Sequence, residues 1–206
     1  MFRRSLDYRN TAWQCLAYNQ AIWEWMFPNP HCPDRLFVID VDEFVKIRPC
    51  EFLGRCRTLP EILWDNPHDI ALNWRLYGSN GETEVKEGNY SVLGRFTRCS
   101  SSLNLHVKVC LDLKNDHLFR FFTSPHCLNC HVHDLQGNDV YGPFNERPRE
   151  FVDELEIAHY ATKSRQECRE RRSFRRADTG RPREEGWEAF FKEHDVNTID
   201  EDTLYE

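Results

Sequence analysis

Two aspartates separated by a single residue follow a short apolar run near the start of the chain. The run Leu36–Ile39 leads directly into Asp40 and Asp42, and Glu43 comes next. Carboxylates gathered at the end of a buried strand repel one another and lose hydration, so they need a positive partner. A Mg²⁺ or Mn²⁺ ion would serve, because these cations take oxygen ligands and commonly bridge to substrate phosphates. An exposed acidic loop is the other interpretation, and the tripeptide alone does not exclude it.

The apolar run before the aspartates is typical of a strand buried on both faces, as in a parallel sheet. In open α/β sheets, ligands bind at the carboxyl ends of the strands. Asp40 and Asp42 are two residues apart, so in a regular strand their side chains share a face. We therefore expect both carboxylates at a sheet edge where a metal ion and a phosphate-bearing ligand can meet.

Hydrophobic periodicity predicts the elements that would position this strand. Apolar residues at helical spacing predict a helix over residues 8–26. Its expected apolar face comprises Ala12, Trp13, Leu16, Ala17, Ala21, Ile22 and Trp25. A helical turn is expected near residues 59–64, and further strands are expected over residues 69–77 and 90–96.

The most regular strand pattern lies at residues 103–113, where an apolar residue occupies every odd position. This alternation places His106 and Lys108 together on the polar face. The stretch 151–170 is predicted to be helical, at least beyond His159. Helices and strands therefore alternate along the chain, which favours an α/β sandwich.

Length and composition indicate one globular domain. The chain has 206 residues and an apolar fraction of 40%, so we expect a single domain over residues 1–206. The arginine-rich segment at about 165–186 is expected to be a charged, mobile part of the surface. The net charge of −7 argues against a nucleic-acid partner, because phosphate binding needs a basic face.

The cysteines and the hydropathy of the chain predict where the protein is located in the cell. Nine cysteines at irregular spacings predict mostly reduced thiols in a reducing environment. No stretch reaches the roughly 18 apolar residues of a membrane span, and the N-terminus lacks the apolar core of a secretory signal. We therefore expect a cytoplasmic protein without a membrane span, unless a longer parent chain carries an anchor.

The motif LFVIDVDEF at 36–44 closely resembles the signature of glycosyltransferases with a GT-A fold. It is most similar to the glycosyltransferase family 2-like group, whose members also resemble glycosyltransferase family 92. Further blocks resemble that group in the same order, and together they span about Thr11 to Leu204. These blocks are ALNWRLYGSNG at 71–81, LHVKVCLDL at 105–113, SPHCLNC at 124–130, IAHYATKS at 157–164 and FKEHDVNTIDEDTL at 191–204.

The resemblance implies an α/β fold of the GT-A, Rossmann-like kind, with a mixed, mainly parallel sheet flanked by helices. In this group, the strand before the aspartates normally follows another strand–helix unit or two, which carry much of the pocket for the nucleotide base. Only 35 residues precede Leu36, and no apolar strand lies before the first predicted helix. We therefore expect an N-terminally shortened domain that lacks part of that pocket.

The resemblance also implies a metal-dependent glycosyltransferase. Such an enzyme moves a sugar from a nucleotide diphosphate sugar to a glycan, a protein-linked glycan or another hydroxyl acceptor. The expected ligands of Mn²⁺ or Mg²⁺ are Asp40, Asp42 and His159. A neutral imidazole such as that of His159 suits Mn²⁺.

Further roles in donor and acceptor binding are implied for residues of the matching blocks. Lys163, Lys108 and His126 are expected near the donor diphosphate, with Lys163 one helical turn beyond His159. Trp74, Gly78 and Ser79 are expected near the acceptor sugar, unless Trp74 is a core residue. Glu82 and Asp134 are the candidate carboxylates for the base that an inverting enzyme needs.

Two alternatives differ from an enzyme. The first is a non-catalytic remnant of the fold or a carbohydrate-binding subunit. The second, weaker alternative is a zinc-stabilised interaction domain, because Cys127 and Cys130 have the CxxC spacing of a zinc knuckle. The adjacent histidines are His126, His131 and His133. A second ligand pair at good spacing is missing unless the fold brings in Cys99 or Cys110.

Overall fold

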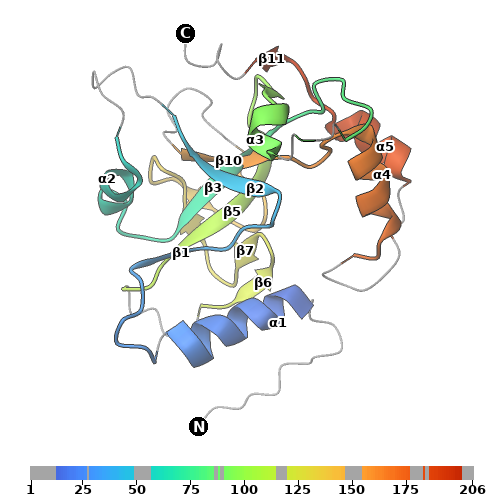
Figure 1. Cartoon of the computed structure of the whole chain (residues 1–206). Helices are drawn as coiled ribbons and strands as arrows, with labels where there is room; N and C mark the ends of the chain where they lie inside the picture. The colour runs from blue at the N-terminus through green and yellow to red at the C-terminus, as the bar shows by residue number, and fades with distance from the viewer. Residues whose placement is uncertain are drawn as a thin grey trace.

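A computed structural model of the chain describes residues 13–26, 28–48, 57–85, 88, 91–114, 120–146, 155–176, 183 and 186–200. These residues form a mixed α/β structure around one main sheet, as Figure 1 shows. Five strands of this sheet lie side by side in the order β1-β5-β3-β10-β2. Their bounds are β1 Arg35–Phe37, β2 Glu43–Ile47, β3 Ile70–Leu76, β5 Asn104–Asp112 and β10 Leu155–His159.

The strand directions differ from the mainly parallel sheet that the resemblance implies. β5 pairs antiparallel with both β1 and β3, and β2 pairs antiparallel with β10, whereas β3 and β10 are parallel. The described sheet is therefore mostly antiparallel. Hydrophobic periodicity indicates which residues face a core but not which way a strand runs, so the sequence pattern does not reveal this arrangement.

β1, β3 and β10 nevertheless all run in the same direction, because β5 is antiparallel to the first two. β3 and β10 end at one edge of the sheet, where β5 and β2 begin, whereas β1 pairs with the last part of β5 and its residue Phe37 is level with Ile70 at the start of β3. The strand expected at Leu36–Ile39 is Arg35–Phe37, at the end of the five-strand order, and it is half-buried rather than buried on both faces. Asp40 and Asp42 follow this strand, as the sequence predicts, and the backbone carbonyl of Asp42 accepts a hydrogen bond from Tyr160 N–H just beyond β10.

The N-terminal helix is confirmed over the described part of residues 8–26, and residues 8–12 lie outside that part. α1 (Trp13–Gln20) continues into the π-helical η1 (Ala21–Met26). Asn19 holds the helix against β6 (Phe122–Ser124), because its amide group exchanges hydrogen bonds of 3.0 and 2.7 Å with the backbone of Phe122. Figure 1 shows α1 beside β6.

The predicted apolar face of this helix is mostly wrong, although Ile22 is buried as predicted. Cys15, Asn19 and Ile22 are buried, whereas Trp13 and Trp25 are 68% and 71% exposed. The face that Asn19 ties to the backbone of β6 is the one that packs on the core, so the two tryptophans remain in solvent. Apolar spacing alone does not show that a polar residue anchors the helix.

The opposite face of the sheet is covered by α2 (Leu59–Trp64), which confirms the helical turn expected there. Thr58 and Glu61 form a capping box at its start, and Pro60 occupies an early position where no backbone donor is needed. Ile62 and Leu63 pack with residues of β3 and β10. The strand predicted over residues 69–77 is confirmed as β3, and every residue of β3 is buried.

Two other predicted elements differ. The strand expected over 90–96 is the short helix α3 (Val92–Arg95), which Ser91 caps by accepting a hydrogen bond from Gly94 N–H; Tyr90 lies outside the described residues. The helix predicted over 151–170 is confirmed beyond His159 by α4 (Arg165–Ser173), whereas Leu155–His159 form the strand β10, and residues 151–154 lie outside the described part. Glu156 gives β10 a polar appearance, but it is buried and bonded to Arg75 at 2.9 Å.

The remaining elements form small pairs around the sheet. α4 packs against α5 (Trp187–His194), as Figure 1 shows, and β4 (Arg98–Cys99) pairs with β11 (Ile199–Asp200). β6 pairs with β7 (Cys127–Leu128), and β8 (Val132–His133) pairs with β9 (Asp139–Val140). Within the described ranges, no helix is long and apolar enough to cross a membrane.

Candidate functional site

Eight side chains meet between the loop that follows β1 and the ends of β3 and β10, and we call this group the carboxyl edge. Its members are Asp40, Asp42, Glu43, Trp74, Lys108, His126, His159 and Arg171. The sequence predicts a binding role for six of the eight: three as metal ligands, two at the donor diphosphate and Trp74 at the acceptor. Glu43 belongs to the predicted acidic cluster but has no predicted ligand role, and Arg171 is not predicted at all.

Lys108 supplies the positive charge beside two of the carboxylates. Its Nζ lies 3.0 Å from Asp40 Oδ2 and 3.4 Å from Glu43 Oε2, and its side chain is 1% exposed. The polar face predicted for β5 is therefore covered in this half of the strand, because Lys108 points into the acidic cluster rather than into solvent. Gln14 of α1 adds a donor to Asp40 at 2.9 Å.

The pKa values of these two carboxyls move in opposite directions. Burial raises the pKa of Glu43 to about 7, and the charge of Lys108 only partly offsets this. Burial also acts to raise the pKa of Asp40, but Lys108 and the hydrogen bonds from Lys108 and Gln14 outweigh it, so this pKa is lowered. Glu43 Oε2 accepts a hydrogen bond from Asp40 N–H at 2.8 Å, which fixes the loop between β1 and β2.

Asp42 has a different positive partner. Its carboxylate forms an ion pair with Arg171 of α4 and lies 3.9 Å from His159 Nε2. Burial and the charges of Arg183 and Arg172 lower the pKa of Arg171 to about 10, so it stays protonated at neutral pH. The arginine-rich segment was expected to be a charged surface, yet this one member reaches the acidic cluster.

Trp74 lies among three histidine rings. Its ring centroid is 4.1 Å from that of His159, 5.1 Å from that of His126 and 4.8 Å from that of His106, which stacks on it at 16°. Trp74 is buried, and its Nε1 has no hydrogen-bond partner within the described protein. The tryptophan is thus packed by histidines rather than presented as an open stacking surface.

Two of these histidines are neutral. Burial lowers the pKa of His159 to about 3, and burial with the charge of Lys108 lowers the pKa of His126 to about 4. His126 Nδ1 lies 3.0 Å from Val107 O, and a carbonyl only accepts, so Nδ1 carries the proton and Nε2 keeps its lone pair. Both rings therefore stay unprotonated at neutral pH and can accept a hydrogen bond or bind a metal ion.

The chemistry of the donors at the carboxyl edge suits Mn²⁺ or Mg²⁺, but their arrangement does not. Asp40 and Asp42 point their carboxylates at separate cations, Lys108 and Arg171. Among the described residues, the one group of three metal-ligating side chains with atoms within 4.8 Å of one another is His131, His133 and Asp139. As arranged here, the predicted ligands Asp40, Asp42 and His159 do not form a metal centre.

The residues expected near the acceptor are covered by the C-terminal segment. Ser79 N–H donates to Asp195 at 2.6 Å, and Asn80 N–H donates to Asn197 at 2.7 Å. A Cβ atom added at Gly78 would lie 2.4 Å from Val196 O, so only glycine fits beneath this segment. Gly78 and Ser79 therefore form a packed turn in the fold.

The two candidate bases lie in structural interactions. Glu82 forms a 2.9 Å ion pair with Arg95, which also bonds Glu167. Asp134 is buried and accepts hydrogen bonds from the backbone of Gln136 and the backbone of Asn138 at 3.0 and 2.8 Å. Asp134 follows β8, which pairs with β3 at Ile70, so β3 and β5 separate it from β1 and the loop that carries Asp40.

Lys163 is not one helical turn beyond His159. His159 ends β10, and Lys163 lies in the loop before α4 with a positive φ of 54°. The spacing argument fails because it assumes a helix across a strand–loop boundary. Ser164 begins α4 by a capping box with Glu167, which fixes where the helix starts.

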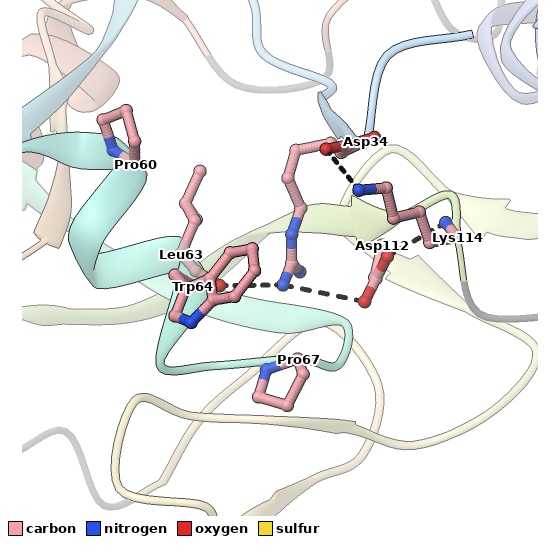
Figure 2. A pocket seen from close by; sticks show the side chains of 8 residues that line it. Asp34, Pro60, Leu63, Trp64, Pro67, Asp112 and Lys114 are labelled. Atoms are coloured by element: carbon pink, nitrogen blue, oxygen red, sulfur yellow. Dashed lines mark hydrogen bonds and ion pairs between the residues drawn. The ribbon is translucent and has the colours of Figure 1, made fainter.

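A surface pocket that the sequence does not predict lies at the other end of β1. Figure 2 shows its lining, with Trp64 of α2 and Pro67 beside the start of β1 and the end of β5. Its volume is about 560 Å³, and its charges are paired internally: Lys114 bonds Asp34 at 2.7 Å. Trp64 is 82% exposed and forms its apolar wall.

Comparisons of the chain with protein-family models, curated proteins and solved structures find no match. The arguments for function therefore rest on the residues of the chain and on their geometry.

Proposed function

We propose that the chain is a glycosyltransferase that uses a nucleotide diphosphate sugar and transfers the sugar to a glycan or another hydroxyl acceptor. The observation that carries the proposal is the meeting of Asp40, Asp42, Lys108, His126 and His159 between the loop that follows β1 and the end of β10. The ordered sequence blocks that resemble the glycosyltransferase family 2-like group supply the second support. The strand order, with one antiparallel strand between β1 and β3, is compatible with a GT-A-like fold.

The chemistry of the proposal centres on the charge of the diphosphate. Lys108 and Arg171 are the cations of the carboxyl edge, and they would neutralise the leaving phosphate as negative charge develops on it. His126 Nε2 and the unpartnered His159 Nδ1 are neutral groups that can hydrogen-bond the ligand. A Mn²⁺ or Mg²⁺ ion stays a prediction, and we assign it no step, because Asp42 is paired with Arg171.

The identity of the base is open within this proposal. Glu43 has a carboxyl pKa of about 7, which suits proton transfer at neutral pH, and its Oε1 has no hydrogen-bond partner in the described protein. It is fully buried beneath Lys108, so we treat it as a group that sets the charge of the cluster.

A second candidate function is a nucleotide-sugar or carbohydrate-binding subunit without catalysis. The ion pair between Asp42 and Arg171 favours this alternative, because it occupies the carboxylate that the predicted metal would need. The same edge would then bind a diphosphate through Lys108 and Arg171 without activating it.

Calorimetry with UDP and GDP, with and without Mn²⁺, tests the proposal. Without Mn²⁺ we expect binding that Arg171→Gln weakens and that Arg169→Gln, an exposed arginine of the same helix, leaves unchanged. An assay of sugar transfer or donor hydrolysis then separates the enzyme from the binding subunit. If neither nucleotide binds the folded chain under either condition, the glycosyltransferase and the nucleotide-sugar-binding subunit are both excluded.

A further inference from the structure

The hairpin formed by β8 and β9 carries three metal-ligating side chains outside the carboxyl edge. His131 and His133 are two residues apart along an extended segment, so their side chains share a face. Asp139 begins β9 and pairs directly with His133 across the hairpin. The topology therefore gathers the three side chains without help from distant parts of the chain.

The turn of this hairpin is held firmly. Asp134 accepts hydrogen bonds from the backbone of Gln136 and the backbone of Asn138, and Gly137 adopts a φ of 79° that favours glycine. This explains why Asp134 is buried in a turn rather than placed near a substrate. The fixed turn sets the register of His133 opposite Asp139.

The separations of the ligand atoms match a small coordination sphere. His133 Nδ1 lies 3.2 Å from Asp139 Oδ1, and His131 Nε2 lies 3.8 Å from the same oxygen. Tetrahedral zinc with bonds of about 2.0–2.1 Å places neighbouring ligand atoms roughly 3.4 Å apart. All three ligand atoms lie within 4.8 Å of one another, so small side-chain rotations close the site.

A second observation concerns His133 Nδ1. This buried atom has no hydrogen-bond partner in the described protein, although Asp139 Oδ1 is only 3.2 Å away. The ring of His133 packs against that of His68 in an edge-to-face contact, with 4.7 Å between the ring centroids. The nitrogen is thus positioned toward the carboxylate without forming the hydrogen bond that would satisfy it.

We propose that His131, His133 and Asp139 bind one Zn²⁺ ion. Two imidazoles and one carboxylate are ligands that zinc prefers, and three protein ligands leave a fourth position for water. The side chains of His131 and Asp139 are 51% and 49% exposed, so the site is open to solvent. The proposal is independent of the glycosyltransferase proposal, because the hairpin pairs with the start of β3 and shares no residue with the carboxyl edge.

This site differs from a zinc knuckle built on Cys127 and Cys130. Cys127 Sγ lies 3.1 Å from the hydroxyl of Ser124 and 3.3 Å from that of Thr123, and neither cysteine belongs to the group of close ligand atoms. The two zinc hypotheses therefore use different side chains and can be separated by substitution.

Calorimetric titration of Zn²⁺ into tag-free, chelator-treated chain tests the proposal. We expect one bound ion, with affinity at least tenfold lower in His131→Gln, His133→Gln and Asp139→Asn, and unchanged in His31→Gln, an exposed histidine elsewhere. Circular dichroism shows whether each variant is folded, and His131→Gln at the exposed rim is the variant least able to disturb the hairpin. The double variant Cys127→Ser/Cys130→Ser should bind zinc like the wild type. Absence of stoichiometric binding, or its loss only in the cysteine variant, would overturn the proposal.

Discussion

The carboxyl edge and the β8–β9 hairpin both gather carboxylates and histidines, but they satisfy them in opposite ways. At the carboxyl edge, Asp40 and Asp42 are paired with Lys108 and Arg171. In the hairpin, by contrast, the carboxylate of Asp139 lies beside two histidines. The carboxyl edge, where the sequence predicts a metal ion, thus contains its own cationic side chains. The β8–β9 hairpin, where the sequence does not predict this site, has ligand atoms without a cation.

Burial explains this difference. A carboxylate removed from water costs several kcal/mol unless a charge or several donors compensate it. Asp42 and Glu43 are 5% and 2% exposed, so the fold has to provide cations for them. Asp139 is half-exposed, and water stabilises its charge, so no internal cation is required.

The largest expected effect tests whether Lys108 neutralises the carboxyl edge. Lys108→Met leaves Asp40 and Glu43 without their shared cation, so the free energy of unfolding should fall by on the order of 3 kcal/mol. Lys114→Met removes an exposed lysine that pairs with Asp34 and should cost less than about 1 kcal/mol. Urea unfolding at pH 7 measures both, and equal costs for the two variants would contradict the account.

The next effect is a pH dependence that originates in His126. Its folded pKa of about 4 is below the ordinary value of 6.5, so the unfolded chain binds more protons between these values and stability falls as pH falls through this window. Between pH 7 and pH 5 this loss amounts to about 2 kcal/mol.

His126→Gln removes that contribution, so its stability should depend less on pH than that of the wild type. The carboxyl of Glu43 changes stability in the opposite direction. Its raised pKa of about 7 makes the folded chain bind a proton more tightly than the unfolded chain, so stability rises as pH falls from 7 toward 4.5. This contribution is the same in the wild type and in His126→Gln. Urea unfolding at pH 5 and pH 7 measures the change in unfolding free energy between the two pH values, with His31→Gln as control. An equal change in the wild type and in His126→Gln would exclude the low pKa of His126.

A smaller effect concerns Arg171 as a competitor of a metal ion at the carboxyl edge. Arg171→Gln frees Asp42, so Mn²⁺ affinity there should rise by about tenfold, which corresponds to roughly 1.4 kcal/mol. Arg169→Gln removes an exposed arginine of the same helix and should change nothing. Manganese binding followed by electron paramagnetic resonance measures this, and an unchanged affinity in Arg171→Gln shows that the ion pair is not what keeps Mn²⁺ away.

The smallest effect is on the metal-free hairpin. His131→Gln changes a half-exposed side chain, so the unfolding free energy without zinc should change by less than about 0.5 kcal/mol. With excess zinc, the wild type should gain stability and the variant should gain much less. Thermal unfolding with and without Zn²⁺ measures both values, and an equal gain in the two proteins would mean that zinc binds elsewhere.

The sequence predicts the secondary-structure elements that form the carboxyl edge better than it predicts the side-chain contacts between them. The buried strand β3, the helix at 59–64 and the strand at 103–113 follow from periodicity and capping residues, which are local signals. The position of Asp40 and Asp42 beyond a strand also follows from the local pattern. These features need no knowledge of how distant segments pack.

The features that the sequence does not reveal depend on distant contacts. Arg171 lies far along the chain from Asp42, and nothing in its arginine-rich surroundings marks it as the member that turns inward. β10 lies in a stretch predicted to be helical, and its charged Glu156 is buried because Arg75 neutralises it inside the protein. Long-range charge pairing thus decides which polar residues are buried, and single-sequence patterns do not contain it.

The most direct test of the contrast between the two regions is an NMR titration of the chain, labelled with ¹⁵N-histidine, with Zn²⁺. We expect the imidazole signals of His131 and His133 to shift and saturate at one equivalent, while His126 and His159 remain neutral and unperturbed. Shifts of His159 at the first equivalent, with His131 and His133 unchanged, would place the cation at Asp42 instead and contradict the account.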